Sequence, residues 1–257
     1  MCTLSVIRTV DGFRVVHNRD EQRTRAEGEP PAWRDVALAG GGVARAIYPV
    51  DPDAGGTWVA ARDDGVVYAI LNVNPSAPRL GGADGSGASY ETVSRGRVIL
   101  DLLSQPADAP LRHPHSDSIR SYRVVRVRRE GDNGSGPVVI EEHRSFGEER
   151  RSRREVLDRP RVWVSSGLGD DVVGPRVPLF EEMVGADATA ATQDAYHRHA
   201  WDDRREISVL MSRADARTTG ITTMEVGLDG VGGVGGVGGV GGVEMAYEVV
   251  PDDRGER

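Results

Sequence analysis

The chain of 257 residues has a mass of 27.6 kDa, which fits one large domain, and its 38% hydrophobic residues and 33 glycines are typical of a globular protein. A formal net charge of -8 and a pI near 5.3 argue against non-specific nucleic-acid binding. No apolar run approaches the ~20 residues needed to span a bilayer, and the single cysteine, Cys2, excludes an intramolecular disulfide and Cys-rich metal sites.

The first part of the chain predicts antiparallel hairpins. Asp11-Gly12 is a strong two-residue turn signal, and Asp63-Asp64-Gly65 marks a second turn. Residues 27–33, rich in Glu, Gly and Pro, predict a loop. The expected strands are Thr3–Val10, Phe13–Asn18, Val43–Tyr48, Gly56–Arg62 and Val66–Val73.

The second part mixes helices and strands. Glu91–Gln105 is the clearest helix, because apolar residues recur at i, i+4 and Pro106 follows its end. The charge run Glu148–Arg154 predicts a solvated face. The other expected helices are Pro178–Val184 and Ala188–Ala200, and the other expected strands are Tyr122–Arg128, Pro137–Glu142, Arg161–Val164, Ile207–Met211, Ile221–Leu228 and Val243–Val250.

Strands in antiparallel hairpins and helices in two blocks indicate an α+β fold rather than alternating βαβ units. We expect a single domain over residues 1–257, interrupted by a low-complexity insert at 231–242 that reads Val-Gly-Gly four times. Without the insert, Leu228-Asp229-Gly230 would join Val243 in a short hairpin, so the repeat is interpreted as an expansion within a turn. A glycine cradle for phosphate is the alternative, but no Lys, Ser or Thr follows the repeat.

Cys2 is the residue with the most chemical potential. Methionine is generally removed before a small second residue, so we expect the mature chain to begin with a cysteine that carries both a thiol and a free α-amine. The thiol is then the nucleophile and the amine a built-in base. The start of the chain has neither a basic n-region nor an apolar h-region, so we expect no targeting peptide and a cytoplasmic location.

Arg19 and Asp20 follow the first hairpin, and antiparallel pairing across its turn places them near Cys2. A guanidinium beside the thiol would favour the thiolate, and a carboxylate could orient the α-amine. A plain surface ion pair at a strand end is the alternative interpretation of the same two residues.

Several motifs together resemble the NRDE family, the family of the eukaryotic transport-and-Golgi-organisation protein 2. The resemblance covers most of the chain except residues 107–160 and the insert. The motifs are Met1-Cys2-Thr3, Asn18-Arg19-Asp20-Glu21, Gly55-Gly56-Thr57-Trp58, Leu71-Asn72, Ser94-Arg95-Gly96-Arg97, Ser165-Ser166, Ser208-Val209 and Arg213-Ala214-Asp215-Ala216-Arg217-Thr218.

The resemblance implies an Ntn-hydrolase-like fold, a four-layer αββα sandwich of antiparallel sheets. It extends distantly to cysteine amidases that cleave conjugated bile acids and penicillin V. By that resemblance Cys2 is the nucleophile, Arg19 and Asp20 flank it, and Asn72 matches an oxyanion-hole asparagine. Ser165 and Ser166 match a further polar group, and Arg217 matches a late active-site arginine.

Two departures concern Ser212 and Gly167, where bacterial relatives often carry a His and a third Ser. The implied activity is hydrolysis of a non-peptide linear amide. The alternative is a non-catalytic protein that binds or traffics haem or an acyl lipid. We expect no cofactor and no metal, because the close pairs His113/His115 and His197/His199 have no further ligand at suitable spacing and suit a protein surface. The expected partner is a small-molecule amide, lipid or haem ligand, with no nucleic acid and no integral membrane segment; the oligomeric state is open.

Overall fold

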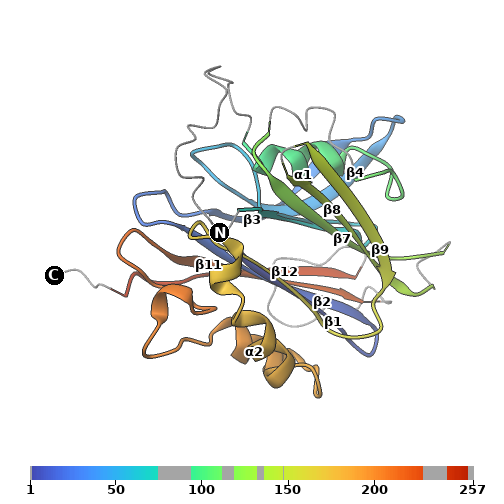
Figure 1. The fold of residues 1–257 in the computed structure, drawn as a ribbon. Coiled ribbons are helices and arrows are strands. Elements are labelled where there is room, and N and C mark those ends of the chain that lie inside the picture. Colours follow the sequence, from blue (N-terminus) through green and yellow to red (C-terminus); the bar gives the residue numbers. More distant parts are fainter. Residues whose placement is uncertain are drawn as a thin grey trace.

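A computed structural model describes residues 2–74, 94–111, 119–131, 136–146, 148–227 and 242–253. Two antiparallel sheets stack face to face (Figure 1). The five-stranded sheet has the order β10 (Arg161–Ser165), β1 (Cys2–Arg8), β2 (Gly12–Gln22), β11 (Ala216–Gly227) and β12 (Val243–Val249). The seven-stranded sheet runs in chain order through β3 (Glu29–Ala37), β4 (Val43–Val50), β5 (Val59–Arg62), β6 (Val67–Asn72), β7 (Tyr122–Arg129), β8 (Val138–Phe146) and β9 (Glu149–Val156).

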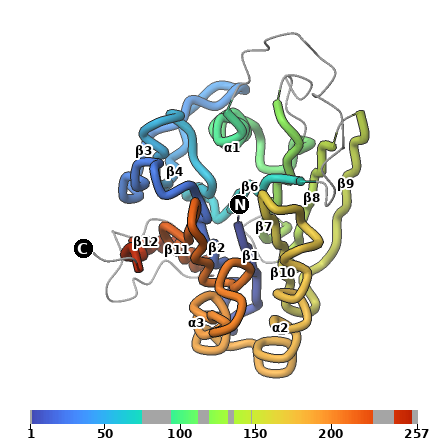
Figure 2. The backbone as a smooth tube through the Cα atoms, turned by 60° about the vertical axis from the view of Figure 1, so that its left-hand side comes forward, coloured from blue at the N-terminus to red at the C-terminus, as the bar shows by residue number. Residues whose placement is uncertain are grey.

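Helices cover the outer face of each sheet, which completes four layers (Figure 2). Helix α1 (Gly96–Leu103) packs on the seven-stranded sheet, where its buried Val98, Ile99, Leu102 and Leu103 meet Tyr68 and Tyr122. Helices α2 (Arg176–Met183) and α3 (Ala190–His197) cover the five-stranded sheet. Short 3-10 turns, η3 (Asp170–Val173) and η4 (Arg205–Ile207), flank these two helices. The expected αββα architecture is confirmed.

The core between the sheets is built from the inward positions of both. Leu4, Val6 and Phe13 come from the five-stranded sheet, and Val59 and Val67 from the other, all essentially inaccessible to solvent. Because successive strand residues alternate between faces, β1 and β2 bury one set here and present the other set to α2 and α3. Both faces of these two strands are therefore covered, and their burial patterns are nearly continuous.

Several expected boundaries are wrong. The first hairpin forms, but its turn is Val10-Asp11 rather than Asp11-Gly12, because Thr9 N donates to Gly12 O. β2 begins at Gly12 and continues through the Asn-Arg-Asp-Glu motif to Gln22. Residues 29–33, expected as part of a loop, begin β3, an edge strand that tolerates Pro30 and Pro31 because a sheet edge needs fewer N–H donors. The charge run is exposed, as expected, but it forms the edge strand β9.

Ile207–Met211 was expected as a strand but contains the end of η4 followed by an irregular segment. Its backbone bonds to other loops, as when Leu210 N donates to His199 O. Five apolar and small residues in a row fit either a strand or a buried loop, and tertiary contacts decide between them. Helix α1 begins at Gly96 rather than Glu91, and residues 91–93 lie outside the described part of the chain. Among the described residues, no helix has both the length and the apolar character needed to cross a membrane.

The Val-Gly-Gly insert at 231–242 lies outside the described residues except for Gly242, but the strands on either side of it pair as the sequence predicted. Val226 lies opposite Val243, and Gly227 N donates to Gly242 O at 2.9 Å. Gly242 has a φ of 75°, a conformation that glycine adopts at no steric cost.

Deleting residues 231–242 should leave the fold intact and the thermal stability unchanged or slightly higher. Gly230 then takes the place of Gly242, and loop closure becomes easier by about 1.4 kcal/mol for a change from about fifteen to about three residues. Thermal melting is the measurement, and deletion of 231–239, which keeps Gly242, is the matched control. A fall of more than about 5 °C in the 231–242 deletion alone would show that Gly230 does not replace Gly242; a fall in both would show that the repeat packs against the protein.

Candidate active site

Cys2 opens β1 in the interior of the five-stranded sheet. In the antiparallel register it lies opposite Arg19 of β2 and Ser165 of β10. Directly opposed residues of antiparallel strands project from the same face. Cys2 belongs to the core cluster between the sheets, so this is the inner face. The expected closeness of Arg19 to Cys2 is confirmed, while its catalytic role stays a prediction.

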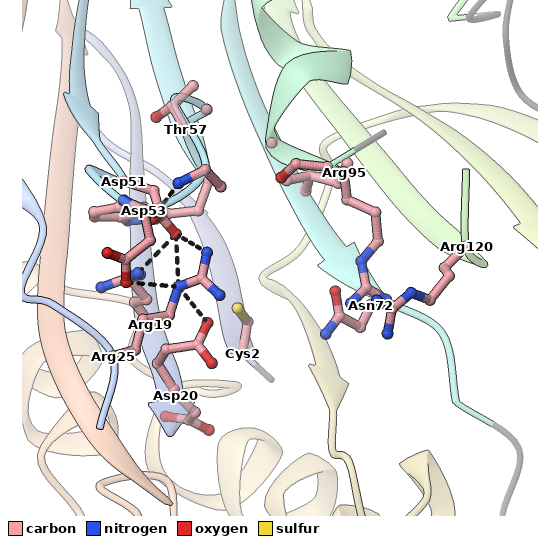
Figure 3. Close-up of a pocket in the computed structure, with 17 residues that line it drawn as sticks. Cys2, Arg19, Asp20, Arg25, Asp51, Asp53, Thr57, Asn72, Arg95 and Arg120 are labelled. Atoms are coloured by element: carbon pink, nitrogen blue, oxygen red, sulfur yellow. Dashed lines mark hydrogen bonds and ion pairs between the residues drawn. The ribbon is translucent and has the colours of Figure 1, made fainter. Parts of the chain in front are cut away.

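A cavity of about 410 Å³ opens beside Cys2 (Figure 3). Its walls come from β1, β2, the segment before β5, the end of β6 and the start of α1. Besides Cys2 and Asn72, the cavity is lined by four carboxylates and four guanidinium groups, those of Asp20, Glu21, Asp51, Asp53, Arg19, Arg25, Arg95 and Arg120. The site is therefore polar, and its formal charges cancel.

One wall of the cavity is held together by Asp51. Its Oδ2 accepts a hydrogen bond from Arg19 Nη2 at 2.9 Å and from Arg25 at 2.8 and 3.1 Å. The Asp51 carboxylate also accepts from the backbone N–H groups of Asp53 and Ala54, which fixes the turn before Gly56. Charge-assisted bonds of this kind are strong when their groups are shielded from water, and Asp51 is only 13% exposed.

Arg19 also lies over the ring of Trp58, with its guanidinium carbon 4.5 Å from the ring centroid. Trp58 is fixed in turn because its Nε1 donates to Thr222 Oγ1 at 3.2 Å. Stacking on an indole stabilises a guanidinium whose hydration has been removed. Arg19 is thus held by Asp51 and Trp58, and both partners direct it along the cavity wall.

The thiol of Cys2 does not have the depressed pKa that the sequence suggested. Burial raises the pKa of Cys2, and the positive N-terminus and the backbone N–H of Asp20 only partly oppose this. The expectation that Arg19 would favour the thiolate is wrong, because Asp51 neutralises Arg19 and desolvation of the sulfur is the larger effect. A thiol of this kind needs a base to take its proton.

Asp20 connects the cavity to the helical layer. Its carboxylate accepts from Thr218 Oγ1 at 2.7 Å and from Arg176 Nη1 at 3.4 Å. The same Arg176 nitrogen donates to Thr3 Oγ1 at 2.7 Å, and Arg176 Nε donates to Ile207 O at 3.0 Å. Both charged side chains are essentially inaccessible to solvent. Asp20 thus ties β2 to the start of α2 immediately beneath Cys2.

The other sequence-predicted residues lie at different distances from this centre. Ser165 Oγ accepts a hydrogen bond from the backbone nitrogen of Cys2 at 3.1 Å. Asn72 lines the cavity at the end of β6, across from Cys2 (Figure 3). Ser166 is buried and its backbone N–H donates to Asp170, which shapes the turn after β10. Arg217 does not line the cavity: its Nη1 donates to Val250 O and Thr218 O.

Asn18, the first residue of the Asn-Arg-Asp-Glu motif, has a structural role. Its side chain donates to His197 O at 2.9 Å and Val209 O at 3.0 Å, and its Oδ1 lies 2.7 Å from His197 Nδ1. His197 Nε2 reaches Ser5 Oγ at 2.6 Å. The expectation of a surface histidine is wrong for His197, which is fully buried and whose pKa burial holds well below its usual value. Asn18 thereby fastens α3 to the outer face of β2.

Two glycine-containing motifs meet where α1 approaches the cavity. Thr57 N donates to Gly96 O at 3.1 Å. A Cβ on Gly96 would lie 2.9 Å from Thr57 N, and one on Gly56 would lie 2.7 Å from the carbonyl carbon of Gly96. Real Cβ atoms do not approach so closely, so both positions require glycine. This contact brings the first turn of α1, with Arg95, to the cavity wall.

Sequence reasoning missed Asp51, Arg25, Arg120 and Arg176, and it quoted Arg95 only as part of a motif. Apart from Asp51, each is an ordinary charged residue outside the first hairpin, with no local pattern to distinguish it. Only Asp51 had a signal, because it immediately precedes Pro52 and a glycine turn. Among the described residues, no group of three or more His, Cys, Asp or Glu side chains is arranged to hold a metal ion.

The sandwich of two antiparallel sheets between helices, with Cys2 at the start of an interior strand, has the αββα architecture that the sequence resemblance implied. The resemblance to the NRDE family is confirmed, since residues 1–127 match the family model described as Transport and Golgi organisation 2. No curated protein sequence matches the chain.

Solved structures similar to the chain include two amide-hydrolysing enzymes or their variants. One is a Caenorhabditis elegans N-acylethanolamine-hydrolyzing acid amidase ortholog, with 13% identity and a TM-score of 0.49 over 87% of this chain and 92% of that one. The other is the C2A mutant of conjugated bile acid hydrolase from Clostridium perfringens, with 13% identity and a TM-score of 0.41 over 98% of this chain and 90% of that one.

Proposed function

We propose that the protein is a cysteine N-terminal-nucleophile amidohydrolase that acts on non-peptide linear amides. One observation carries the proposal: the Cys2 side chain lines a polar cavity while the nitrogen of the same residue lies 3.1 Å from Ser165 Oγ. Once Met1 is removed, that nitrogen is a free α-amine, held by Ser165 next to the thiol. A nucleophile and a base are then combined in one residue.

The proposed reaction begins with transfer of the thiol proton to the α-amine as Sγ attacks the carbonyl carbon of the amide. The carbonyl oxygen becomes an oxyanion, to which the side-chain amide of Asn72 donates. The amine leaving group departs with the proton, and a water molecule hydrolyses the acyl-thioester. Burial raises the pKa of the Cys2 thiol, so in this proposal the thiol is neutral before attack and the α-amine takes its proton during attack.

The charged lining of the cavity favours a polar ligand over haem or an unmodified acyl chain, because burying unpaired charges against an apolar surface is costly. The amidase proposal therefore takes precedence over non-catalytic binding of haem or lipid. Within that proposal, Arg19 and Asp20 are positioning residues: Arg19 shapes the wall through Asp51, and Asp20 connects to Arg176.

We expect the purified protein to lack Met1 and to release amines from at least one member of a panel of N-acyl amino acids, N-acylethanolamines, conjugated bile acids and penicillin V. Replacing Cys2 with Ala should lower turnover by about a thousandfold or more, because it removes the nucleophile. Intact mass and amine release are the measurements.

The matched control separates the thiol from the amine. Inserting Gln between Met1 and Cys2 retains Met1, since Gln is large, and so keeps the thiol but removes its free amine. The proposal expects this variant to lose turnover as Cys2→Ala does, with circular dichroism unchanged in both. A parent that retains Met1, or an insertion variant with full turnover, contradicts the mechanism. A parent whose Cys2 is inert to thiol reagents leaves a binding protein as the better account.

A further inference from the structure

The wall of the cavity opposite Asp51 carries two further arginine side chains. Arg95 and Arg120 lie side by side there, next to Asn72 and across from Cys2 (Figure 3). Arg19 and Arg25 on the other wall form ion pairs with Asp51 at 2.9 and 2.8 Å, so a carboxylate of the protein already compensates their charges. Asp20 is likewise paired with Arg176.

In the described part of the chain, Arg95 and Arg120 have no carboxylate partner of this kind. Among the described residues, neither side chain forms an ion pair, and Arg95 Nη1 has only a long hydrogen bond of 3.4 Å to Ser121 O. Burial and the neighbouring charge of Arg120 lower the pKa of Arg95, which is the direction expected for a cation placed beside another cation. The carboxylate of Glu21 opposes this shift, but as the smallest of the contributions. Arg120 itself is exposed. Two like charges placed together repel, and an anion that joins them relieves the repulsion.

The start of α1 adds to the same field. Helix α1 begins at Gly96, which lines the cavity, and its N-terminus has no capping side chain and no acidic residue in the first turn. The N–H groups of Arg97 and Val98 are already bonded to Ser94 O and Arg95 O, so the helix contributes through its dipole, whose positive end favours an anion. The close contact between Gly56 and Gly96 fixes this helix end against the wall, so its direction toward the cavity does not depend on a flexible loop.

We infer that Arg95, Arg120 and the N-terminus of α1 form an anion subsite, and that the ligand of this cavity is a small molecule bearing a carboxylate or phosphate group. This rests on the proposed function: the scissile amide lies at Cys2 and the anionic group at the arginine pair. A planar guanidinium binds carboxylate and phosphate oxygens in a two-pronged geometry, which gives orientation as well as attraction. The substrate class is therefore an anionic linear amide.

The test compares two thiol reagents that are nearly equal in size. Iodoacetate is an anion and iodoacetamide is neutral, and both transfer a two-carbon group to the Cys2 sulfur as iodide leaves. The ratio of their labelling rates at low ionic strength cancels the thiol pKa and its accessibility. The same chain unfolded in urea gives the reference ratio.

We expect the folded parent to exceed the reference ratio by about fivefold, which corresponds to about 1 kcal/mol, and to lose the excess as salt is added. Arg95→Met and Arg120→Met should each reduce the excess. Arg97→Met is the matched control, because Arg97 is exposed on the same helix and does not line the cavity. A folded ratio equal to or below the reference, or an equal reduction by Arg97→Met, overturns the subsite.

A second measurement separates the subsite from the proposed function. Inorganic phosphate or acetate should raise the melting temperature of the parent and have less effect on the Arg95→Met/Arg120→Met double variant, and the larger shift identifies the preferred oxyanion. If Cys2 is inert to both reagents but phosphate or acetate still stabilises the parent selectively, the hydrolase proposal fails and the subsite stands. Equal stabilisation of both proteins overturns the subsite even if amides are hydrolysed.

Discussion

Replacing Arg176 with Met should lower the free energy of unfolding by about 3–5 kcal/mol, the cost typical of breaking a buried ion pair by removing one partner. Arg176 is 1% exposed and donates to Asp20, to Thr3 Oγ1 and to Ile207 O. Methionine retains the apolar length of the side chain, so the loss reports mainly on the charge and its hydrogen bonds. Urea unfolding of the parent and the variant is the measurement.

The control is Arg198→Met, because Arg198 also pairs with carboxylates, at Glu248 and at Asp194 3.7 Å away, but is 45% exposed. Exposed pairs contribute about 0–1 kcal/mol. If both substitutions lower the free energy of unfolding by the same amount, burial does not make the Arg176–Asp20 pair more important for stability than an exposed pair. Adding Asp20→Asn to Arg176→Met should cost less than the two single losses added together, since the carboxylate is then no longer left buried without its partner.

Lowering the pH from 7 to 5 should destabilise the protein by about 2 kcal/mol through His17 alone, with a further loss in the same direction from His197. Burial lowers the pKa of His17 from 6.5 to about 3, assisted by the charge of Arg19. His197 is lowered by burial first and then by the neighbouring charges of His17, Arg14, Arg198 and Arg176. Below pH 6.5 the histidines of the unfolded chain are protonated while the buried histidines of the folded protein stay neutral. Their contribution to the free energy of unfolding is therefore fully present above pH 6.5 and falls as the pH is lowered toward 3.

Urea unfolding at pH 7 and pH 5 measures this loss. The variant His197→Gln cannot titrate but keeps amide groups that can reach Ser5 and Asn18, so its stability should depend less steeply on pH. The carboxyls of Glu141 and Asp253 have depressed pKa values, and the stability that they contribute is lost only below their ordinary values of 4.5 and 3.8, outside this window. A difference under about 1 kcal/mol between the two pH values in the parent contradicts the assignment of neutral buried histidines.

The first hairpin and its chemistry were predictable because they are local. The sequence predicted the hairpin but set its turn one residue too late: Thr9 N donates to Gly12 O, so Val10 and Asp11 form the turn, and this register places Arg19 opposite Cys2. The fold class followed from the grouping of strands and helices. What the sequence did not show depends on long-range contacts. Asp51 neutralises Arg19 from 32 positions away, and Arg176 reaches Asp20 from 156. Neither residue has a local pattern that predicts its partner, so the raised thiol pKa was not predictable either.

Local ambiguity explains the misassigned elements. β3 contains two prolines and β9 is dominated by charge, so neither has the apolar alternation that indicates a strand. Both are edge strands, where exposure removes the need for that alternation. Ile207–Met211 has the composition of a strand, but among the described residues it forms no ladder with its neighbour β11: Thr218 N donates to Met211 O, and beyond that only the isolated bridge Ser212–Arg217 follows.

The position of Cys2 also decides how the protein can be handled. β1 begins at the cavity with Cys2, so a tag fused before Cys2 would take away the free α-amine that the proposed mechanism uses. Fusion at the other end avoids this effect, because residues 251–253 are exposed and do not line the cavity. Inactivity of an N-terminally tagged preparation would say nothing about the native chain.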